Sequence, residues 1–366
     1  AEPLCRELVA GRKTALGRRD EKYLDSVNTL ALLLHQLGKF EEAEPFSKEK
    51  LAGCRAAHGD HHPDTITAID TLSQLLSDVG KLEEALPLKR ESLAVKRKVL
   101  GDRHPDTLLS VNNLGVLLND LGRATSNVRM LREAEPLKRE ALAGCREVLG
   151  NRHPHTLASI ANLADMLMQL GHADPRALEE AEPLCRELVA GRKTALGRRD
   201  EKYLDSVNTL ALLLHQLGKF EEAEPFSKEK LAGCRAAHGD HHPDTITAID
   251  TLSQLLSDVG KLEEALPLKR ESLAVKRKVL GDRHPDTLLS VNNLGVLLND
   301  LGRATSNVRM LREAEPLKRE ALAGCREVLG NRHPHTLASI ANLADMLMQL
   351  GHADPRALEE AEPLCR

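Results

Sequence analysis

The stretch that decides the fold runs from Gly101 to Gly122 and reads GDRHPDTLLSVNNLGVLLNDLG. Pro105 has the position of a first helical residue, where a missing backbone N–H breaks no hydrogen bond. Apolar residues then follow at positions 108, 111, 114, 118 and 121, each three or four residues after the last. This spacing predicts an amphipathic helix with one apolar face.

A second helix is predicted just before this stretch, where Lys81 to Leu100 read KLEEALPLKRESLAVKRKVL. Its apolar residues recur at helical spacing, its polar face is strongly charged, and Gly101 ends it. The pattern and its relatives each contain one proline, which we expect in the first turn of the helix. These prolines are Pro45, Pro87, Pro136 and Pro183. The building block is therefore a helical hairpin.

The hairpin pattern recurs along the chain. The glycines that end successive apolar stretches are Gly38, Gly80, Gly122, Gly171 and Gly218, at spacings of 42, 42, 49 and 47 residues. Insertions of seven residues near 124–131 and of five near 172–177 account for the longer spacings. We expect both to lengthen the turn inside the hairpin, because loop length affects stability only slowly. First helices are predicted over 23–37, 64–79, 106–121 and 155–170, each followed by a second helix.

The chain is also an internal duplication, since residues 181–366 repeat residues 1–186 without a difference. We predict one continuous solenoid over 1–366, with a first four-hairpin unit at 1–180, an identical unit at 181–360 and the start of a further unit at 361–366. Recent duplication, engineering and the representation of a longer, phase-averaged array all remain open as explanations. Neither end has a polar capping repeat, so we expect both ends to be adhesive.

The hairpins resemble the tetratricopeptide repeat. Val111, Leu114, Gly115 and Leu118, followed by Ala134, have the spacing of its signature. The 42-residue period and the segment LGDRHPDT at 100–107 are similar to the kinesin-light-chain variety of this repeat. The resemblance implies an all-α, right-handed superhelical solenoid of antiparallel helix hairpins. It also implies that the first helices line the concave surface and that the protein is an interaction scaffold.

The composition excludes several classes of protein. A formal net charge of −4 gives no reason to expect a nucleic-acid or membrane-surface partner. Aromatic residues make up 2% of the chain, so the core must consist of Leu, Ala and Val. No apolar run approaches the roughly 18 residues of a membrane span. The seven cysteines lack any CxxC pairing, which favours reduced thiols and a cytoplasmic location.

Motifs that carry chemistry are missing from the sequence. It has no Gly-rich phosphate loop, nucleophile elbow or paired carboxylates, so we expect no catalytic residue, no cofactor and no enzyme activity. His58, His61 and His62 have metal-like spacing, but no further ligands lie nearby and we expect no metal site. His104 and His153 precede prolines and are expected to cap helices.

The predicted first helices contain no Lys or Arg, whereas basic residues exceed acidic ones in the rest of each unit. Two explanations remain open. The acids are either ordinary solvated or helix-start residues, or they make the concave surface prefer a basic or neutral segment over an acidic one. The acids are Asp25, Asp64, Asp70, Asp78, Asp106, Asp120 and Asp165.

Polar residues beside the apolar stripe of the first helices are the predicted peptide-binding residues. Asn is a poor helix former, and its amide can both donate to and accept from an extended backbone. Hydrogen bonding of Asn113 and Asn162 between neighbouring helices is an equally good explanation. The predicted residues are Asn28, Asp70, Gln74, Asn112, Asn113, Asn162 and Asp165, with Asn208, Asp250, Gln254, Asn292, Asn293, Asn342 and Asp345 in the second copy.

Two functions therefore follow from the sequence. The first is a protein–protein interaction scaffold that binds an extended segment on the concave, lysine-free surface. The second is a structural array that stacks on itself head to tail and has no dedicated ligand.

Overall fold

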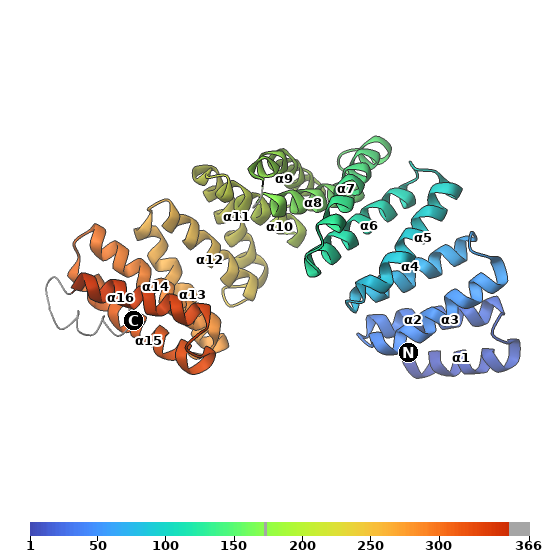
Figure 1. Ribbon diagram of the computed structural model, residues 1–366, viewed down its shortest axis with the longest axis horizontal. Coiled ribbons are helices and arrows are strands. Elements are labelled where there is room, and N and C mark those ends of the chain that lie inside the picture. The colour runs from blue at the N-terminus through green and yellow to red at the C-terminus, as the bar shows by residue number, and fades with distance from the viewer. Residues whose placement is uncertain (172–173, 351–366) are drawn as a thin grey trace. The chain divides into compact units, whose positions relative to one another are not determined.

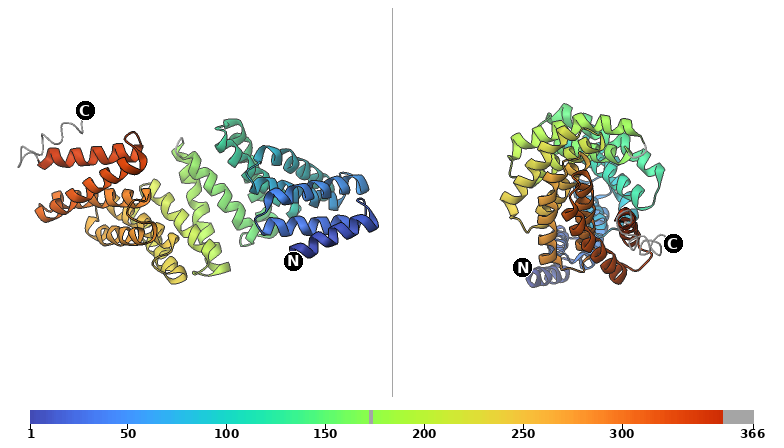
Figure 2. Two further views of the ribbon diagram at one scale, coloured as in Figure 1. Left: turned by 90° about the horizontal axis from the view of Figure 1, so that it is seen from below. Right: turned by 90° about the vertical axis from the view of Figure 1, so that its left-hand side faces the viewer.

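The computed structural model describes residues 1–171 and 174–350 (Figure 1). Within these ranges it contains sixteen helices and no strand, which confirms the all-α repeat solenoid. Consecutive helices run antiparallel, as two further views show (Figure 2). The helices are α1 Glu2–Leu16, α2 Glu21–Gln36, α3 Phe40–His58, α4 Pro63–Asp78, α5 Leu82–Leu100, α6 Pro105–Ala124, α7 Val128–Leu149, α8 Pro154–Leu170, α9 Pro175–Leu196, α10 Glu201–Gln216, α11 Phe220–His238, α12 Pro243–Asp258, α13 Leu262–Leu280, α14 Pro285–Ala304, α15 Val308–Leu329 and α16 Pro334–Leu350.

The chain forms two compact units, Ala1–Gly191 and Arg192–Arg366. The division at residue 180 that the sequence repeat suggests stays a prediction. The predicted further unit at 361–366 and part of the five-residue insertion, residues 172–173, lie outside the described residues. None of the described helices is both long and apolar enough to cross a membrane.

The first helices α4, α6 and α8 begin close to where the sequence predicts, because capping residues fix their first turn. At α4, α6 and α8 a proline is the first helical residue and a histidine precedes it. The Nδ1 atoms of His62, His104 and His153 each accept a hydrogen bond, at 3.2 Å, from the backbone N–H two residues later. The predicted capping role of His104 and His153 is confirmed, and His62 shares it.

The predicted place of the prolines is wrong. Pro45 and Pro87 are the sixth residues of α3 and α5, and Pro136 and Pro183 are the ninth residues of α7 and α9. They lie inside the helices, because each helix begins several residues before this proline: α3, α5 and α7 begin directly after a three-residue turn, and α9 begins at Pro175. Each proline therefore removes an N–H donor from an interior turn.

The seven-residue insertion does not lengthen a loop either. The turn between α6 and α7 has three residues, 125–127, as does the turn 37–39 between α2 and α3. Instead, α6 has 20 residues where α2 has 16, and α7 has 22 where α3 has 19. The insertion is divided as four and three residues, close to one turn on each helix, so both arms of the hairpin grow by a similar length.

This extension also changes which residue makes the turn. Gly38 and Gly80 have left-handed φ angles of 71° and 77° in the shorter hairpins. Gly122, which the sequence pattern aligned with them, is instead buried inside α6, where a Cβ would lie 2.8 Å from Leu131 Cδ2. The equivalent left-handed position in the turn is Ser126, with φ of 51°.

In three hairpins of the first unit the two helices pack on each other through a leucine and a glycine. A leucine near the start of a first helix contacts a glycine of the following second helix so closely that a Cβ there would lie 2.3 to 2.5 Å from the leucine. The pairs in the first unit are Leu24–Gly53, Leu108–Gly144 and Leu157–Gly191. We call such a pair a leucine–glycine contact.

Successive second helices are joined by ion pairs between an arginine and a glutamate of the next one. One such pair occurs in each repeat, with N–O distances of 2.5 to 2.6 Å. The arginine always belongs to the earlier helix and the glutamate to the later one. The pairs in the first unit are Arg55–Glu91, Arg97–Glu140 and Arg146–Glu187.

Candidate functional site

A cavity of about 210 Å³ lies between α4, α5 and α6. Three residues predicted from the sequence, Asp70, Gln74 and Asn113, line it from two different first helices. The other lining residues are Ser73, Lys89, Lys96, Leu109 and Ser110. We call the surface formed by α2, α4, α6 and α8 the first-helix face.

Both carboxylate oxygens of Asp70 accept hydrogen bonds from side chains of the protein. Its Oδ1 accepts a hydrogen bond from Ser92 Oγ at 2.5 Å, and its Oδ2 accepts one from Lys96 Nζ at 2.6 Å. Lys96 Nζ also donates to Ser110 Oγ at 2.8 Å. Asp70 therefore connects α4 to α5 and, through Lys96, to α6, and its charge is compensated.

The expectation of a lysine-free surface is wrong. The first helices carry no lysine, but lysines of the second helices extend between them. Lys50 Nζ lies 3.0 Å from Asp25 Oδ1, and Lys89 Nζ donates to Gln74 Oε1 at 3.3 Å. The sequence prediction counted the charges of each helix separately and therefore overlooked these lysines. A lysine side chain is long enough to place its ammonium beyond its own helix.

Lys89 is the one lysine of the cavity whose charge no neighbouring carboxylate contacts directly among the described residues. Burial lowers its pKa, Asp70 and Asp78 oppose this shift, and Lys96 adds to it. The cavity therefore combines a compensated Asp70–Lys96 pair with one additional positive charge.

The asparagines divide into two groups. Asn162 Nδ2 donates to Asn112 Oδ1 at 3.1 Å, and Asn112 is buried, so these two connect α8 to α6. The interhelical explanation thus applies to Asn162, with Asn112 and not Asn113 as its partner. Asn113 is half-buried, lines the cavity, and its amide has no hydrogen-bond partner in the described part of the chain.

The other predicted residues of the first copy lie along the same face. Gln74 Nε2 donates to Asp78 Oδ1 at 2.8 Å, and Asp78 Oδ2 lies 2.6 Å from His35 Nε2 of α2. Asp165 is exposed and accepts from Gln169 at 2.6 Å, and Asn28 is half-buried.

The second copy repeats these environments. Asp250 contacts Ser272 and Lys276, Gln254 donates to Asp258, and Asn342 donates to Asn292 at 3.2 Å. Asn208 and Asn293 are half-buried, and Asp345 is exposed.

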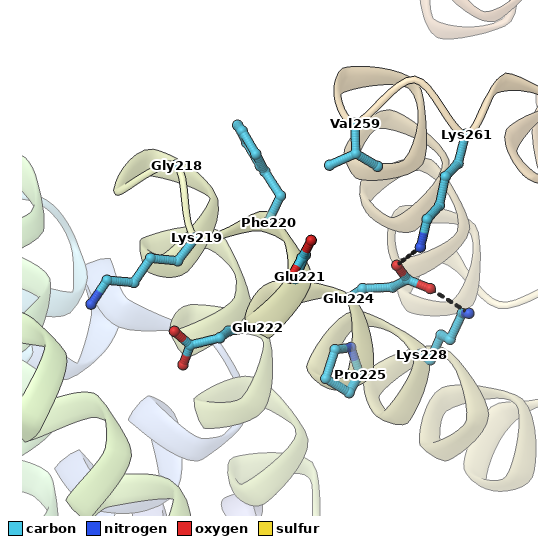
Figure 3. Close-up of a pocket in the computed structure, with 10 residues that line it drawn as sticks. All are labelled: Gly218, Lys219, Phe220, Glu221, Glu222, Glu224, Pro225, Lys228, Val259 and Lys261. Atoms are coloured by element: carbon cyan, nitrogen blue, oxygen red, sulfur yellow. Dashed lines mark hydrogen bonds and ion pairs between the residues drawn. The ribbon is translucent and has the colours of Figure 1, made fainter.

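A different pocket, which the sequence reasoning missed, lies at the turns of successive hairpins. It measures about 850 Å³ in the second unit and about 860 Å³ at the same residues of the first. Figure 3 shows Lys228 and Lys261 converging on Glu224, which accepts a hydrogen bond from each at 2.6 Å. These bonds lower the pKa of Glu224. The recurrent Lys-x-Glu-Glu-Ala segment at 39–43, 81–85, 219–223 and 261–265 is the sequence signal for this pocket.

The histidine-rich turn brings possible metal ligands together. Ligand atoms of His58, His62 and Asp64 lie within 4.8 Å of one another. The two imidazoles stack at 4.4 Å and 23°, and His62 Nδ1 accepts a hydrogen bond from the Asp64 N–H. The expectation of no metal site stays a prediction.

The buried cysteines lie in apolar surroundings. Burial raises the pKa of Cys54 and Cys145, and raises that of Cys185 to about 12. These thiols therefore lack the thiolate character of a nucleophile.

Comparison with known proteins identifies the repeats. Models described as tetratricopeptide repeat match residues 23–98, 107–155, 203–278 and 287–335. No curated protein matches the chain.

Solved structures agree with the family models. A substituted variant of a Podosopora anserina protein described as having kinesin light chain nearly identical TPR-like repeats is similar at 25% identity, with a TM-score of 0.51 over 60% of this chain and 98% of that one. The same protein without the substitution gives 24%, 0.50, 59% and 97%. The apo quorum sensor NprR from B. thuringiensis shares the fold at 12% identity, with a TM-score of 0.56 over 94% of this chain and 88% of that one.

The hairpin period, the all-helical architecture and these matches agree. The chain belongs to the tetratricopeptide repeat family, and its repeats resemble those of the kinesin-light-chain variety.

Proposed function

We propose that the protein is a scaffold that binds an extended partner segment along the first-helix face, with the cavity between α4, α5 and α6 as an anchoring point. Tetratricopeptide proteins generally mediate protein–protein contacts, and the fold is typically non-enzymatic. The observation that carries the proposal is the convergence of Gln74 and Asn113, from two helices, on one cavity where the amide of Asn113 has no hydrogen-bond partner among the described residues.

The cavity offers complementary groups for a peptide. The Asn113 amide can donate to a carbonyl and accept from an N–H of a backbone that passes across it. Leu109 is partly exposed and supplies an apolar wall. Asn293 offers the same amide in the second copy. A partner with a repeated binding segment therefore gains avidity if it reaches both positions.

The partner segment is basic or neutral over most of the face, because Asp25, Asp120 and Asp165 are exposed there. Lys89 reverses this preference locally, so the residue that enters the cavity is neutral or acidic. The six described cysteines are free, which supports a reducing, cytoplasmic location as part of the proposal.

The test is a peptide-array screen followed by affinity measurement with the strongest peptide. The double variant Asn113→Ala, Asn293→Ala should weaken binding by about threefold to tenfold, the worth of one lost hydrogen bond per site. The matched control is Asn151→Ala with Asn331→Ala, which removes two exposed turn asparagines. A screen in which no peptide binds above background, or a peptide whose affinity is the same for all variants, contradicts the proposal.

A further inference from the structure

The pocket at the turns of successive hairpins has no part in the peptide binding proposed above. It has nearly the same volume in both copies, about 860 Å³ in the first and about 850 Å³ in the second. In the first copy it is lined by the turn between α2 and α3, by the first turns of α3, and by Val79 and Lys81 of the next hairpin. The pocket therefore joins two successive hairpins of one unit.

Phe40, the first residue of α3, supplies an aromatic wall of this pocket. Its ring meets the His35 imidazole edge-on, with centroids 5.3 Å apart and an angle of 71° between the planes. His35 Nε2 lies 2.6 Å from Asp78 Oδ2 of α4, so the imidazole is held as well. Phe220 meets His215 in the same way in the second copy. The aromatic wall is therefore formed before any ligand arrives.

Most of the charged side chains that line the pocket have an oppositely charged partner. Glu44 accepts hydrogen bonds from Lys48 at 2.6 Å and from Lys81 at 2.7 Å. Lys39 donates to a glutamate of α1 at 2.8 Å, and Glu42 accepts from an arginine of the same helix. These groups are therefore satisfied by the protein itself.

Glu41 is the exception. Its side chain is exposed, and no cationic group of the described residues forms an ion pair or a hydrogen bond with it. In the second copy Lys219 and Glu222 also have partners, and Glu221 is again without one among the described residues. Both Glu221 and Phe220 are drawn in Figure 3, where no dashed line reaches the Glu221 carboxylate. The pocket thus combines an aromatic ring with one carboxylate that has no ion-pair partner.

The next hairpin shows which part of this arrangement is unusual. An acid in the first turn of a helix is common, because it interacts favourably with the helix dipole. Glu83 has that position in α5 and is also exposed, but it follows Leu82 and lines neither copy of the pocket. Leu82 packs on the same apolar core as Phe40, so packing at this position does not require an aromatic ring. The pairing of Phe40 with Glu41 therefore needs another explanation.

We propose that the pocket binds an arginine side chain of a partner protein. The guanidinium stacks on the Phe40 ring and donates two hydrogen bonds to the Glu41 carboxylate. Arginine suits the pocket better than lysine, because its flat guanidinium is weakly hydrated and can contact a ring and a carboxylate together. Phe220 and Glu221 bind a second arginine in the same way. The inference does not depend on the cavity that contains Asn113.

The experiment is a peptide array probed with the full chain, in which every peptide carries one arginine and is made again with citrulline, a neutral group of the same shape. We expect arginine peptides to be selected. By isothermal titration calorimetry, the citrulline form of the strongest peptide should bind at least about fivefold more weakly. The double variant Glu41→Gln, Glu221→Gln should weaken the arginine peptide by a similar factor and leave the citrulline form unchanged.

The matched control is Glu83→Gln with Glu263→Gln, which removes the same charge from the same helix position of the next hairpin. This variant should bind the arginine peptide as the wild type does. Phe40→Leu with Phe220→Leu copies the residue found at position 82 and should weaken binding about threefold through the loss of stacking. Circular dichroism checks that all variants remain folded.

Three results would overturn the inference: an array that selects no arginine peptide, a citrulline form that binds equally well, or a control variant as defective as the Glu41 variant. The last result would mean that acids at these turns attract cations without a specific site. The two proposals can also fail separately. An arginine peptide weakened by Asn113→Ala with Asn293→Ala, but not by the glutamate variants, overturns this one alone, whereas the reverse result supports it.

Discussion

Lys138 is almost completely buried, which is unusual for a lysine. It is 2% exposed, and its ammonium donates one hydrogen bond, at 3.0 Å, to the backbone carbonyl of Asn162. Gly115 makes room for it, since a Cβ there would lie 3.0 Å from Lys138 Cγ. Burial lowers the pKa of Lys138, and the carboxylates of Asp165 and Asp120 oppose this shift. The native state therefore holds the proton of Lys138 less tightly than the unfolded chain does.

We predict that Lys138→Met, combined with Lys318→Met in the second copy, raises the free energy of unfolding at pH 7 by about 1 kcal/mol per site. The unfolded lysine has its ordinary pKa of 10.5, so unfolding of the wild type takes up protons between the lowered pKa and 10.5. Wild-type stability thus rises with pH in that window, and the advantage of the variant shrinks. Urea denaturation at pH 7 and pH 10 measures both effects. A variant less stable than wild type at pH 7 would show that the hydrogen bond to Asn162 outweighs the desolvation of the ammonium.

The proposed binding residues illustrate what a sequence can and cannot predict at this scale. The position of Gln74 and Asn113 on one face followed from helical spacing, because spacing fixes direction around an axis. The contributions of Lys89 and Lys96 could not be predicted in this way. They belong to α5, and their presence in the cavity depends on how closely α4 and α6 approach.

At the scale of the helices, the sequence predicted where the first helices begin but not how the seven inserted residues are used. Proline after histidine marks a helix start through local chemistry, and the structure follows it at α4, α6 and α8. Whether an insertion forms a loop or extends two helices depends on their mutual packing. In α6 and α7 that packing includes the contact of Leu131 with Gly122.

The turn of this extended hairpin supplies a prediction. Ser126 has the left-handed conformation that Gly38 and Gly80 have in the shorter hairpins. A side chain in this conformation costs about 1 to 2 kcal/mol, part of which glycine loses again through its greater freedom in the unfolded chain. Ser126→Gly together with Ser306→Gly should therefore stabilise each hairpin by about 0.5 to 1 kcal/mol.

Thermal unfolding followed by circular dichroism measures this gain as a higher midpoint. The control is Ser77→Gly, since Ser77 lies inside α4 and glycine there should lower the midpoint. Equal changes for the two substitutions would contradict the role assigned to the turn.

At the scale of the whole molecule, identical residues differ only in their neighbours, so one substitution can be compared at two places. Leu157 is buried by the leucine–glycine contact with Gly191, and Leu337 is largely exposed. Leu157→Ala should cost about 2 to 5 kcal/mol, and Leu337→Ala less than about 1 kcal/mol. Denaturant unfolding of the two variants side by side measures the difference. Equal costs would contradict the assignment of the larger cost to the leucine–glycine contact.

The extra turn at the tip of the α6–α7 hairpin has a practical consequence. Residues 124–126 are exposed there, and the arms below them lengthened together without disturbing the rest of the repeat. Foreign sequence grafted between Thr125 and Ser126, such as an affinity tag or a fluorescent label, would sit above the neighbouring turns and leave the leucine–glycine contacts untouched. The same graft at 305 and 306 would give the duplicated chain two reporters in chemically equivalent positions.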